Sequence, residues 1–418
     1  MKWERIGSVV FISVLFLNAG LVAAQEETSG PLWPSLWVRK GDTLSMKGFE
    51  TDIDSWHFDV GGRFALDAIK YDDDNARGST VEFDAAQLVF EGAYKDRFRF
   101  RIEPDLIGVD TTYNLFQAWG SWKFLEAARV TAGLIRVALG SEFATPQEDF
   151  PLIGYSFTSY LDGRYDWGAR LDGEMFRETF WYELTGIVGS GFNVDGKRLG
   201  SPQFSARMIA KPFRFLNLPA LNGLFLGGSF AFSPSYDDPI TLTTPFDSTV
   251  FTTPKLDGGK ATWLHLELGW HWGPIRLGAE QILGAVDDVP VGGGQEIDMD
   301  QLTSWVIYGA WNITGETTLW RRGRWQPVGA PKYGFGRFEV GSRYSNADID
   351  RGLFTYGITD YNSSTQEVRT FTLNLNWYPM EGLRLCAGWV KTIADHELST
   401  FGDTNRDSSF ILLLELDL

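Results

Sequence analysis

The last nine residues of the chain alternate between two kinds of side chain. One parity is wholly apolar, in Phe410, Leu412, Leu414, Leu416 and Leu418. Glu415 and Asp417 lie on the other parity. Because successive side chains of a β-strand point to opposite faces, this segment predicts a strand with one apolar side and one partly charged side. A chain that ends in such a strand suggests a sheet whose last strand closes on another strand.

The same alternation recurs along most of the chain. In the segment 368–378, for example, Phe371, Leu373, Leu375 and Trp377 alternate with Thr372, Asn374 and Asn376. Each such segment is close to the ~9–11 residues that a tilted membrane strand requires. About sixteen segments follow this pattern: 56–69, 81–94, 97–108, 113–125, 129–137, 164–176, 178–188, 201–212, 223–234, 260–272, 274–284, 302–317, 335–346, 368–378, 383–394 and 407–418.

These segments predict an all-β fold, a closed antiparallel transmembrane β-barrel of about 16 strands that resembles a porin. A sheet facing lipid must close, because an open edge would leave backbone groups unpaired in hydrocarbon. Even strand numbers are the rule for bacterial barrels, and about sixteen strands leave an aqueous lumen. A soluble β-sandwich or a secreted carbohydrate-binding protein also has alternating strands. It accounts less well for large apolar rows on strand after strand opposite charged rows.

The N-terminus is typical of a secretory signal peptide over residues 1–24. Lys2 and Arg5 precede an apolar stretch, and Val22-Ala23-Ala24 offers small residues for cleavage. Removal of this segment, with Lys2, Glu4 and Arg5, takes the formal charge from −17 to −18. We expect an N-terminal periplasmic segment over 25–55, a transmembrane barrel over 56–418, and a location in the outer membrane after export through the periplasm.

Several classes of function have little support in this composition. The strong acidity argues against a nucleic-acid partner, which needs a basic surface. The only cysteine, Cys386, cannot form an internal disulfide. The four histidines form no metal-binding motif, and no G-x-S-x-G elbow is present. We therefore expect a protein that is not an enzyme and has no catalytic residues, metal site or cofactor.

The segment 138–163 is too long and too apolar for a simple turn between two strands. We expect it to fold inward and narrow the lumen, with its aromatic and aliphatic side chains packed against the wall. In this hypothesis Glu142, Glu148 and Asp149 face the lumen. The alternative is an extracellular loop folded on itself, because loops of this length are either functional or disordered.

Four sequence strings carry a family resemblance: DRFRFRIEPDL (96–106), WNITGE (311–316), GRFEVGSRYSNADID (336–350) and LNLNWYP (373–379). Together with the C-terminal strand they resemble the phosphate-selective porin O and P family. The resemblance covers most of the chain after residue 24 and is densest in its last hundred residues. It implies a 16-stranded outer-membrane barrel, commonly a homotrimer, with long outer loops and a lumen lined by arginine and lysine that conducts phosphate.

The inward parity of the expected strands carries many arginines, which suit oxyanions because the planar guanidinium donates two parallel hydrogen bonds. Arg97, Arg99 and Arg101 should stack about 6.6–6.8 Å apart along one face. The expected ion pathway also includes Arg63, Arg136, Arg164, Arg170, Arg337 and Arg343.

We therefore expect an outer-membrane porin for passive diffusion of small hydrophilic solutes, among them anions such as phosphate. Two alternatives stay open. A general or cation-tolerant pore is favoured if the many acids line the lumen, and a non-channel structural barrel is the third reading.

Overall fold

The computed structural model describes residues 37–40, 43–46, 49–53, 55–71, 78–107, 115–189, 201–216, 218–246, 248–256, 258–291 and 295–418. The expected signal peptide lies outside these residues. The expected 25–55 segment is described only from residue 37, where three short strands are β1 (Trp37–Lys40), β2 (Thr43–Met46) and β3 (Phe49–Ile53). None of the helices in the described part of the chain has the length and hydrophobicity to cross a membrane.

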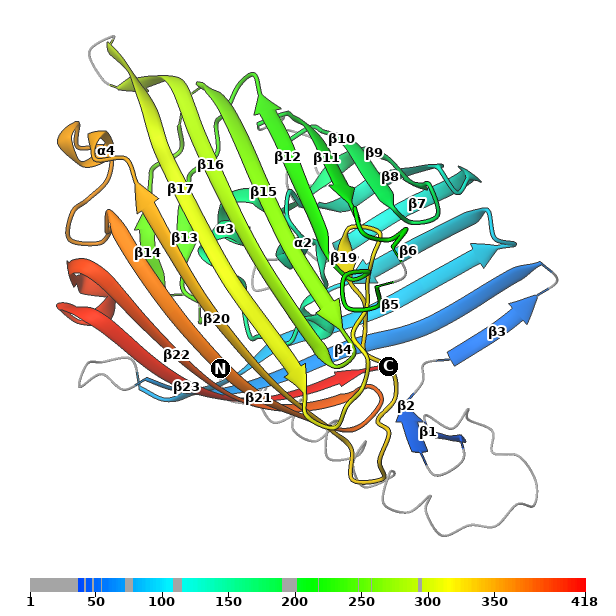
Figure 1. Cartoon of the computed structure of the whole chain (residues 1–418). Helices are drawn as coiled ribbons and strands as arrows, with labels where there is room; N and C mark the ends of the chain where they lie inside the picture. Colours follow the sequence, from blue (N-terminus) through cyan, green and yellow to red (C-terminus); the bar gives the residue numbers. More distant parts are fainter. Residues whose placement is uncertain are drawn as a thin grey trace. The chain divides into compact units, whose positions relative to one another are not determined.

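Sixteen long strands form a closed antiparallel barrel in which each strand pairs with the next along the chain (Figure 1). This confirms the expected fold. The strands are β4 (Trp56–Tyr71), β5 (Thr80–Tyr94), β6 (Phe98–Pro104), β7 (Leu115–Leu125), β8 (Ala128–Val137), β9 (Arg164–Met175), β10 (Phe180–Ile187), β11 (Gln203–Ala210), β12 (Phe225–Ser233), β15 (Lys260–Trp272), β16 (Ile275–Val291), β17 (Gln295–Asn312), β20 (Arg337–Ile349), β21 (Glu367–Met380), β22 (Leu383–Leu398) and β23 (Thr404–Asp417).

The last strand closes the barrel against the first. Residues 409–417 of β23 pair with residues 63–71 of β4. Beyond the strand, the Leu418 N–H donates to the Gly62 carbonyl at 2.9 Å. The short strand β3 pairs with the beginning of β4. The apolar, alternating C-terminal segment therefore forms the seam that the sequence predicts.

The two faces of the wall differ as strand alternation requires. In β21, Phe371 and Leu373 are exposed on the outside, whereas Thr372 and Asn374 are buried on the lumen side. In β23, Leu412 is 65% exposed and Glu415 is 2% exposed. Large apolar side chains thus cover the surface that meets lipid, and polar ones face inward.

The connections at the two ends of the barrel differ in length. Turns such as 95–97, 126–127, 273–274 and 381–382 lie at one end, which in outer-membrane barrels faces the periplasm. Most long connections lie at the other end. The segment 313–336 is an exception, because it belongs to the short-turn end and still carries a hairpin, β18–β19.

Half of the barrel is filled by its own loops. Phe157, Leu242, Val250, Phe251 and Leu353 belong to one buried apolar cluster against β12 to β22. Figure 1 shows α2, α3 and β19 within the ring of strands. Besides β1 to β3, the described elements that are not among the sixteen long strands are α2 (Ser141–Ala144), η2 (Gln147–Asp149), α3 (Phe157–Asp162), β13 (Thr241–Thr243), β14 (Thr249–Thr252), β18 (Trp320–Arg321), β19 (Arg324–Trp325), α4 (Gly352–Thr355) and η3 (Ser399–Phe401).

Candidate functional site

The loop 138–163 between β8 and β9 crosses to the opposite wall of the barrel. The Glu142 carboxylate accepts a hydrogen bond from Arg343 of β20 at 2.6 Å. The Glu142 backbone N–H donates to Glu280 of β16 at 2.8 Å. Glu142 is fully buried, so its expected place on the lumen surface is wrong. The physical reason is that the Arg343 guanidinium is also buried and requires a counter-charge.

Apolar contacts hold the rest of this loop. Phe150 packs edge-on against Tyr308 of β17, with 5.2 Å between ring centroids. The Pro151 carbonyl accepts a hydrogen bond from Asn376 of β21 at 2.7 Å. Phe157 lies in the apolar cluster of the filled half. The loop is therefore fixed along its length, with its aromatic side chains on the wall.

Two further segments enter the lumen. The connection 234–259 carries the β13–β14 hairpin and covers α3. Asp238 in this connection pairs with Arg164 of β9 at 2.8 Å. The β18–β19 hairpin enters from the short-turn end, with Trp320 and Trp325 both buried. Three segments from two ends of the barrel thus narrow the same lumen.

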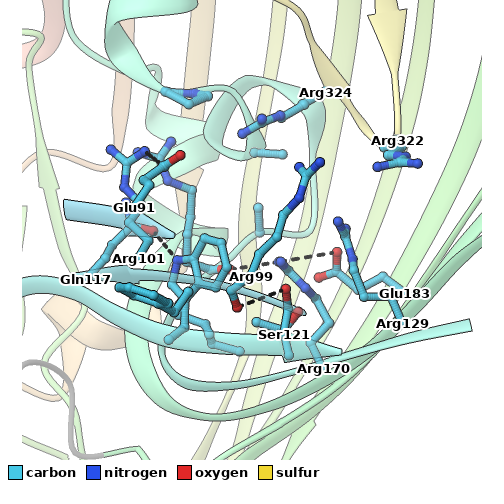
Figure 2. Close-up of a pocket in the computed structure, with 18 of the residues that line it drawn as sticks. Glu91, Arg99, Arg101, Gln117, Ser121, Arg129, Arg170, Glu183, Arg322 and Arg324 are labelled. Carbon is cyan, nitrogen blue, oxygen red and sulfur yellow. Dashed lines mark hydrogen bonds and ion pairs between the residues drawn. The ribbon is translucent and has the colours of Figure 1, made fainter. Parts of the chain in front are cut away.

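A cavity of about 580 Å³ remains between these segments and the strands β4 to β11. Figure 2 shows Arg322 and Arg324 on one side of this cavity and Arg99, Arg129 and Arg170 on the wall opposite. The cationic lining consists of Arg99, Arg101, Arg129, Arg136, Arg170, Arg207, Arg322 and Arg324. The acidic lining consists of Asp59, Glu91, Glu148 and Glu183. Arginines thus outnumber carboxylates two to one.

Several of these arginines are neutralised by neighbours. Arg101 donates to Glu91 at 2.6 Å and to Glu103 at 2.8 Å. Arg129 pairs with Asp172 at 2.7 Å, and Arg170 lies 3.6 Å from the same carboxylate. These pairs form a belt along the wall, in which each cation has an acid within reach.

Arg99 and Arg324 differ from these ion-paired arginines. Neither side chain has an ion pair or hydrogen bond with a residue in the described ranges, and both are exposed to the cavity. Arg99 projects from β6 and Arg324 from β19, so two unpaired guanidinium groups reach the same space from separate elements. This arrangement can bind an anion with several donors at once.

The other arginines expected in the pathway hold structure. Arg136 donates to the carbonyl oxygens of Phe143 at 3.0 Å and Thr145 at 2.9 Å, and so supports the base of the loop. Arg63 pairs with Glu415 at 2.7 Å across the β4–β23 seam. Arg337 donates to the Val328 carbonyl at 2.8 Å.

Arg97 does not join the expected stack with Arg99 and Arg101. It lies in the turn 95–97, exposed at the end of the barrel, because the strand begins only at Phe98. The stack therefore has two members rather than three.

A second, smaller cavity of about 250 Å³ lies on the other side of Glu148. Its acids are Glu148, Asp149, Glu381, Glu415 and Asp417, against Arg276, Arg337 and Arg384. Burial, and then repulsion by Glu148, raises the pKa of Asp149 to about 7. Glu148 thus separates an arginine-rich cavity from an acid-rich one.

Arg322 and Arg324 were missed in the sequence analysis because they lie outside the strands. Their signal is the string WRRGRW at 320–325, in which three arginines lie between two tryptophans. Arg322 (φ 51°) and Gly323 (φ 78°) form the tight two-residue turn of a hairpin. A glycine after a charged residue between two aromatics could have indicated this hairpin.

Comparison with solved structures found similar barrels at low identity. OmpT of Vibrio cholerae in its trimer form has a TM-score of 0.54 and 9% identity, over 87% of this chain and 100% of that one. DcaP, an outer-membrane channel of Acinetobacter baumannii, has a TM-score of 0.54 and 12% identity, over 89% and 100%. An anion-selective porin from Comamonas acidovorans has a TM-score of 0.53 and 11% identity, over 87% and 100%.

These likenesses support the porin fold. The search of curated sequences found no match. The family model for phosphate-selective porin O and P matches residues 58–406, which include all sixteen barrel strands in whole or in part. The chain therefore belongs to the phosphate-selective porin O and P family of outer-membrane porins, which are not enzymes.

Proposed function

We propose that this porin prefers small anions, phosphate among them, and passes them by diffusion through the arginine-rich cavity. The observation that carries the proposal is the pair of unpaired guanidinium groups, Arg99 and Arg324, in a cavity where arginines outnumber acids. Low-dielectric walls focus the field of such charges on a passing ion. Guanidinium groups also stay protonated at any working pH and offer a planar fork to an oxyanion.

A general or cation-tolerant pore is the second candidate, and a specific observation favours it. The smaller cavity beyond Glu148 has more acids than arginines. An ion that crosses the lumen past both cavities meets a positive and then a negative region. The region with the greater resistance to ion flow then sets the selectivity. We place that region at the arginine cavity, because three inserted segments meet there.

The test is a reversal potential measured across a planar bilayer in a salt gradient. We expect the sign of an anion-preferring channel. The double variant Arg99→Gln/Arg324→Gln should lower the anion-to-cation permeability ratio by roughly fivefold, as about 1 kcal/mol of lost attraction at short range implies. Cation preference in the unmodified protein would overturn the proposal, and absence of conductance would support a non-channel barrel.

Arg369→Gln provides the matched control. Arg369 lies on β21, is exposed on the outward parity, and pairs with Glu367. The substitution removes one positive charge without changing the lumen. We expect the reversal potential to stay unchanged.

We also propose that the barrel assembles as a homotrimer. The support is the family membership and the trimer form of the similar OmpT barrel. Mass determination of the detergent-extracted, unboiled protein tests this, and a monomer at all concentrations would contradict it.

A further inference from the structure

The β18–β19 hairpin is docked on the loop 138–163 through two short polar side chains. The Trp320 indole N–H donates to the Ser141 hydroxyl at 3.1 Å. The Trp325 backbone N–H donates to the Thr145 hydroxyl at 3.1 Å. Ser141 and Thr145 belong to the same turn of the loop, because the Thr145 hydroxyl also donates to the Ser141 carbonyl at 2.7 Å. Segments from opposite ends of the barrel therefore meet at one joint.

Aromatic packing makes this joint dry. Trp320 stacks on Phe225 with 4.1 Å between ring centroids. The Trp325 indole N–H donates to the Tyr308 hydroxyl at 2.9 Å, and Trp325 itself is fully buried. Hydrogen bonds in such surroundings have no water to replace them, so their loss leaves buried groups unsatisfied.

The tip of the hairpin is held separately. Arg321 pairs with Glu178 at 2.9 Å, and Arg322 with Glu174 at 3.2 Å. Both acids follow or end β9, at the short-turn end. Gly323 lies at φ 78° against Trp181, where a Cβ would meet the ring at 2.7 Å. Of the three arginines in this hairpin, only Arg324 has no ion pair with a described residue.

We propose that Ser141 and Thr145 are positioning residues for selectivity: they hold the hairpin so that Arg324 stays in the ion path opposite Arg99. The hairpin spans the gap between two anchors, the joint at its base and the acids at its tip. Arg324 lies between them, on the strand that leads back to the joint. This inference rests on the proposed function, because it assigns the placement of one of the two unpaired arginines to the joint.

Thr145→Val and Trp320→Phe test the joint from its two sides. Thr145→Val keeps the side-chain size but removes both hydrogen bonds of the hydroxyl, from the Trp325 N–H and to the Ser141 carbonyl. Trp320→Phe removes the indole N–H and part of the ring that stacks on Phe225. The hairpin should therefore leave its place at least about fivefold more often, because one ordinary hydrogen bond contributes about 1 kcal/mol. We expect greater open-channel current noise and a lower anion-to-cation permeability ratio in both variants. Thr145→Ser keeps the hydroxyl and should restore both readouts.

Trp389→Phe is the matched control. Its indole N–H donates to the Ser408 hydroxyl at 2.9 Å on β22–β23, away from the hairpin. The same chemical change there should alter neither noise nor selectivity. Wild-type noise and selectivity in both Thr145→Val and Trp320→Phe would overturn the proposal.

A second measurement asks whether the joint acts through Arg324. In an Arg324→Gln background, Thr145→Val should still raise the noise but should no longer change the permeability ratio. A further change of the ratio in that background would overturn the positioning role. Cation preference in the unmodified protein contradicts the proposed function instead. The noise measurement and the Thr145→Ser rescue then still decide whether the joint holds the hairpin.

Discussion

Arginines on the inner face of the barrel have different surroundings in its two halves. In the half formed by β4 to β11, Arg99 faces an open cavity and has no ion pair with any residue that the structure describes. In the half formed by β15 to β22, Arg276 and Arg343 are at most 1% exposed. Arg276 pairs with Glu339 at 2.6 Å, and Arg343 with Glu142 at the same distance.

Strand alternation places all these arginines on the inward face, so parity does not distinguish them. The difference arises from coverage. The loop 138–163 and the β13–β14 hairpin lie on one half of the wall and exclude water there, whereas the other half stays open. An inward arginine can therefore face an open cavity in one half, as Arg99 does, and anchors the inserted loop in the other half, as Arg343 does.

The largest expected effect is on stability in the filled half. Arg343→Met leaves Glu142 buried without its partner, which should lower the free energy of unfolding by about 3–5 kcal/mol. Arg99→Met, the matched change in the open half, should cost little. Denaturant unfolding in detergent measures both. Equal losses of unfolding free energy in the two variants would contradict the difference between the two halves.

Removal of apolar volume from the filled half should come next. Leu242 of β13 is fully buried. Leu242→Ala should cost roughly 2–5 kcal/mol through lost burial and the cavity left behind. Because this residue lies away from the arginine cavity, the reversal potential should stay at the wild-type value. A change of selectivity with unchanged stability would place Leu242 in the ion path and contradict the division of the lumen.

The smallest effect should be a pH dependence at the boundary of the two cavities. The pKa of Asp149 is raised to about 7, first by burial and then by Glu148. The carboxyl is therefore mostly neutral below that pH and ionised above it. We expect anion preference to strengthen as the pH falls from about 8 to about 6. Asp149→Asn should reduce this change, and an unaltered pH profile in that variant would exclude Asp149 as its source.

The barrel could be predicted from the sequence because its signal is local and repeated. All sixteen expected segments overlap the observed strands, and the alternation of Thr372 and Leu373 gives the two faces directly. Strand ends were less accurate. The segment 302–317 was expected where β17 covers 295–312, because Ile313 and Thr314 continue the alternation into a turn.

The site could be predicted only in part, because pairing depends on contacts between distant segments. Arg99 and Arg101 line the arginine-rich cavity, and their place in the ion pathway stays a prediction. Glu142 could not be distinguished from Glu148 in the sequence, since its burial depends on Arg343, two hundred residues later. The hairpin with Arg324 is too short to show the alternation of a membrane strand. A search for barrel strands in the sequence therefore does not find it.

The seam between β4 and β23 has a consequence for how the protein is made. Residues 63–71 pair with residues 409–417, so the contact that closes the barrel has nearly the largest sequence separation in it. The strand β4 therefore cannot complete its pairing before the last strand is present. Contacts of such long range form late and slowly. Until then two strand edges are open to pairing with other chains. We infer that this chain must be kept from pairing with other chains until β23 has paired with β4. We also infer that destabilising substitutions in β23 reduce assembly more than equally destabilising substitutions in a central hairpin.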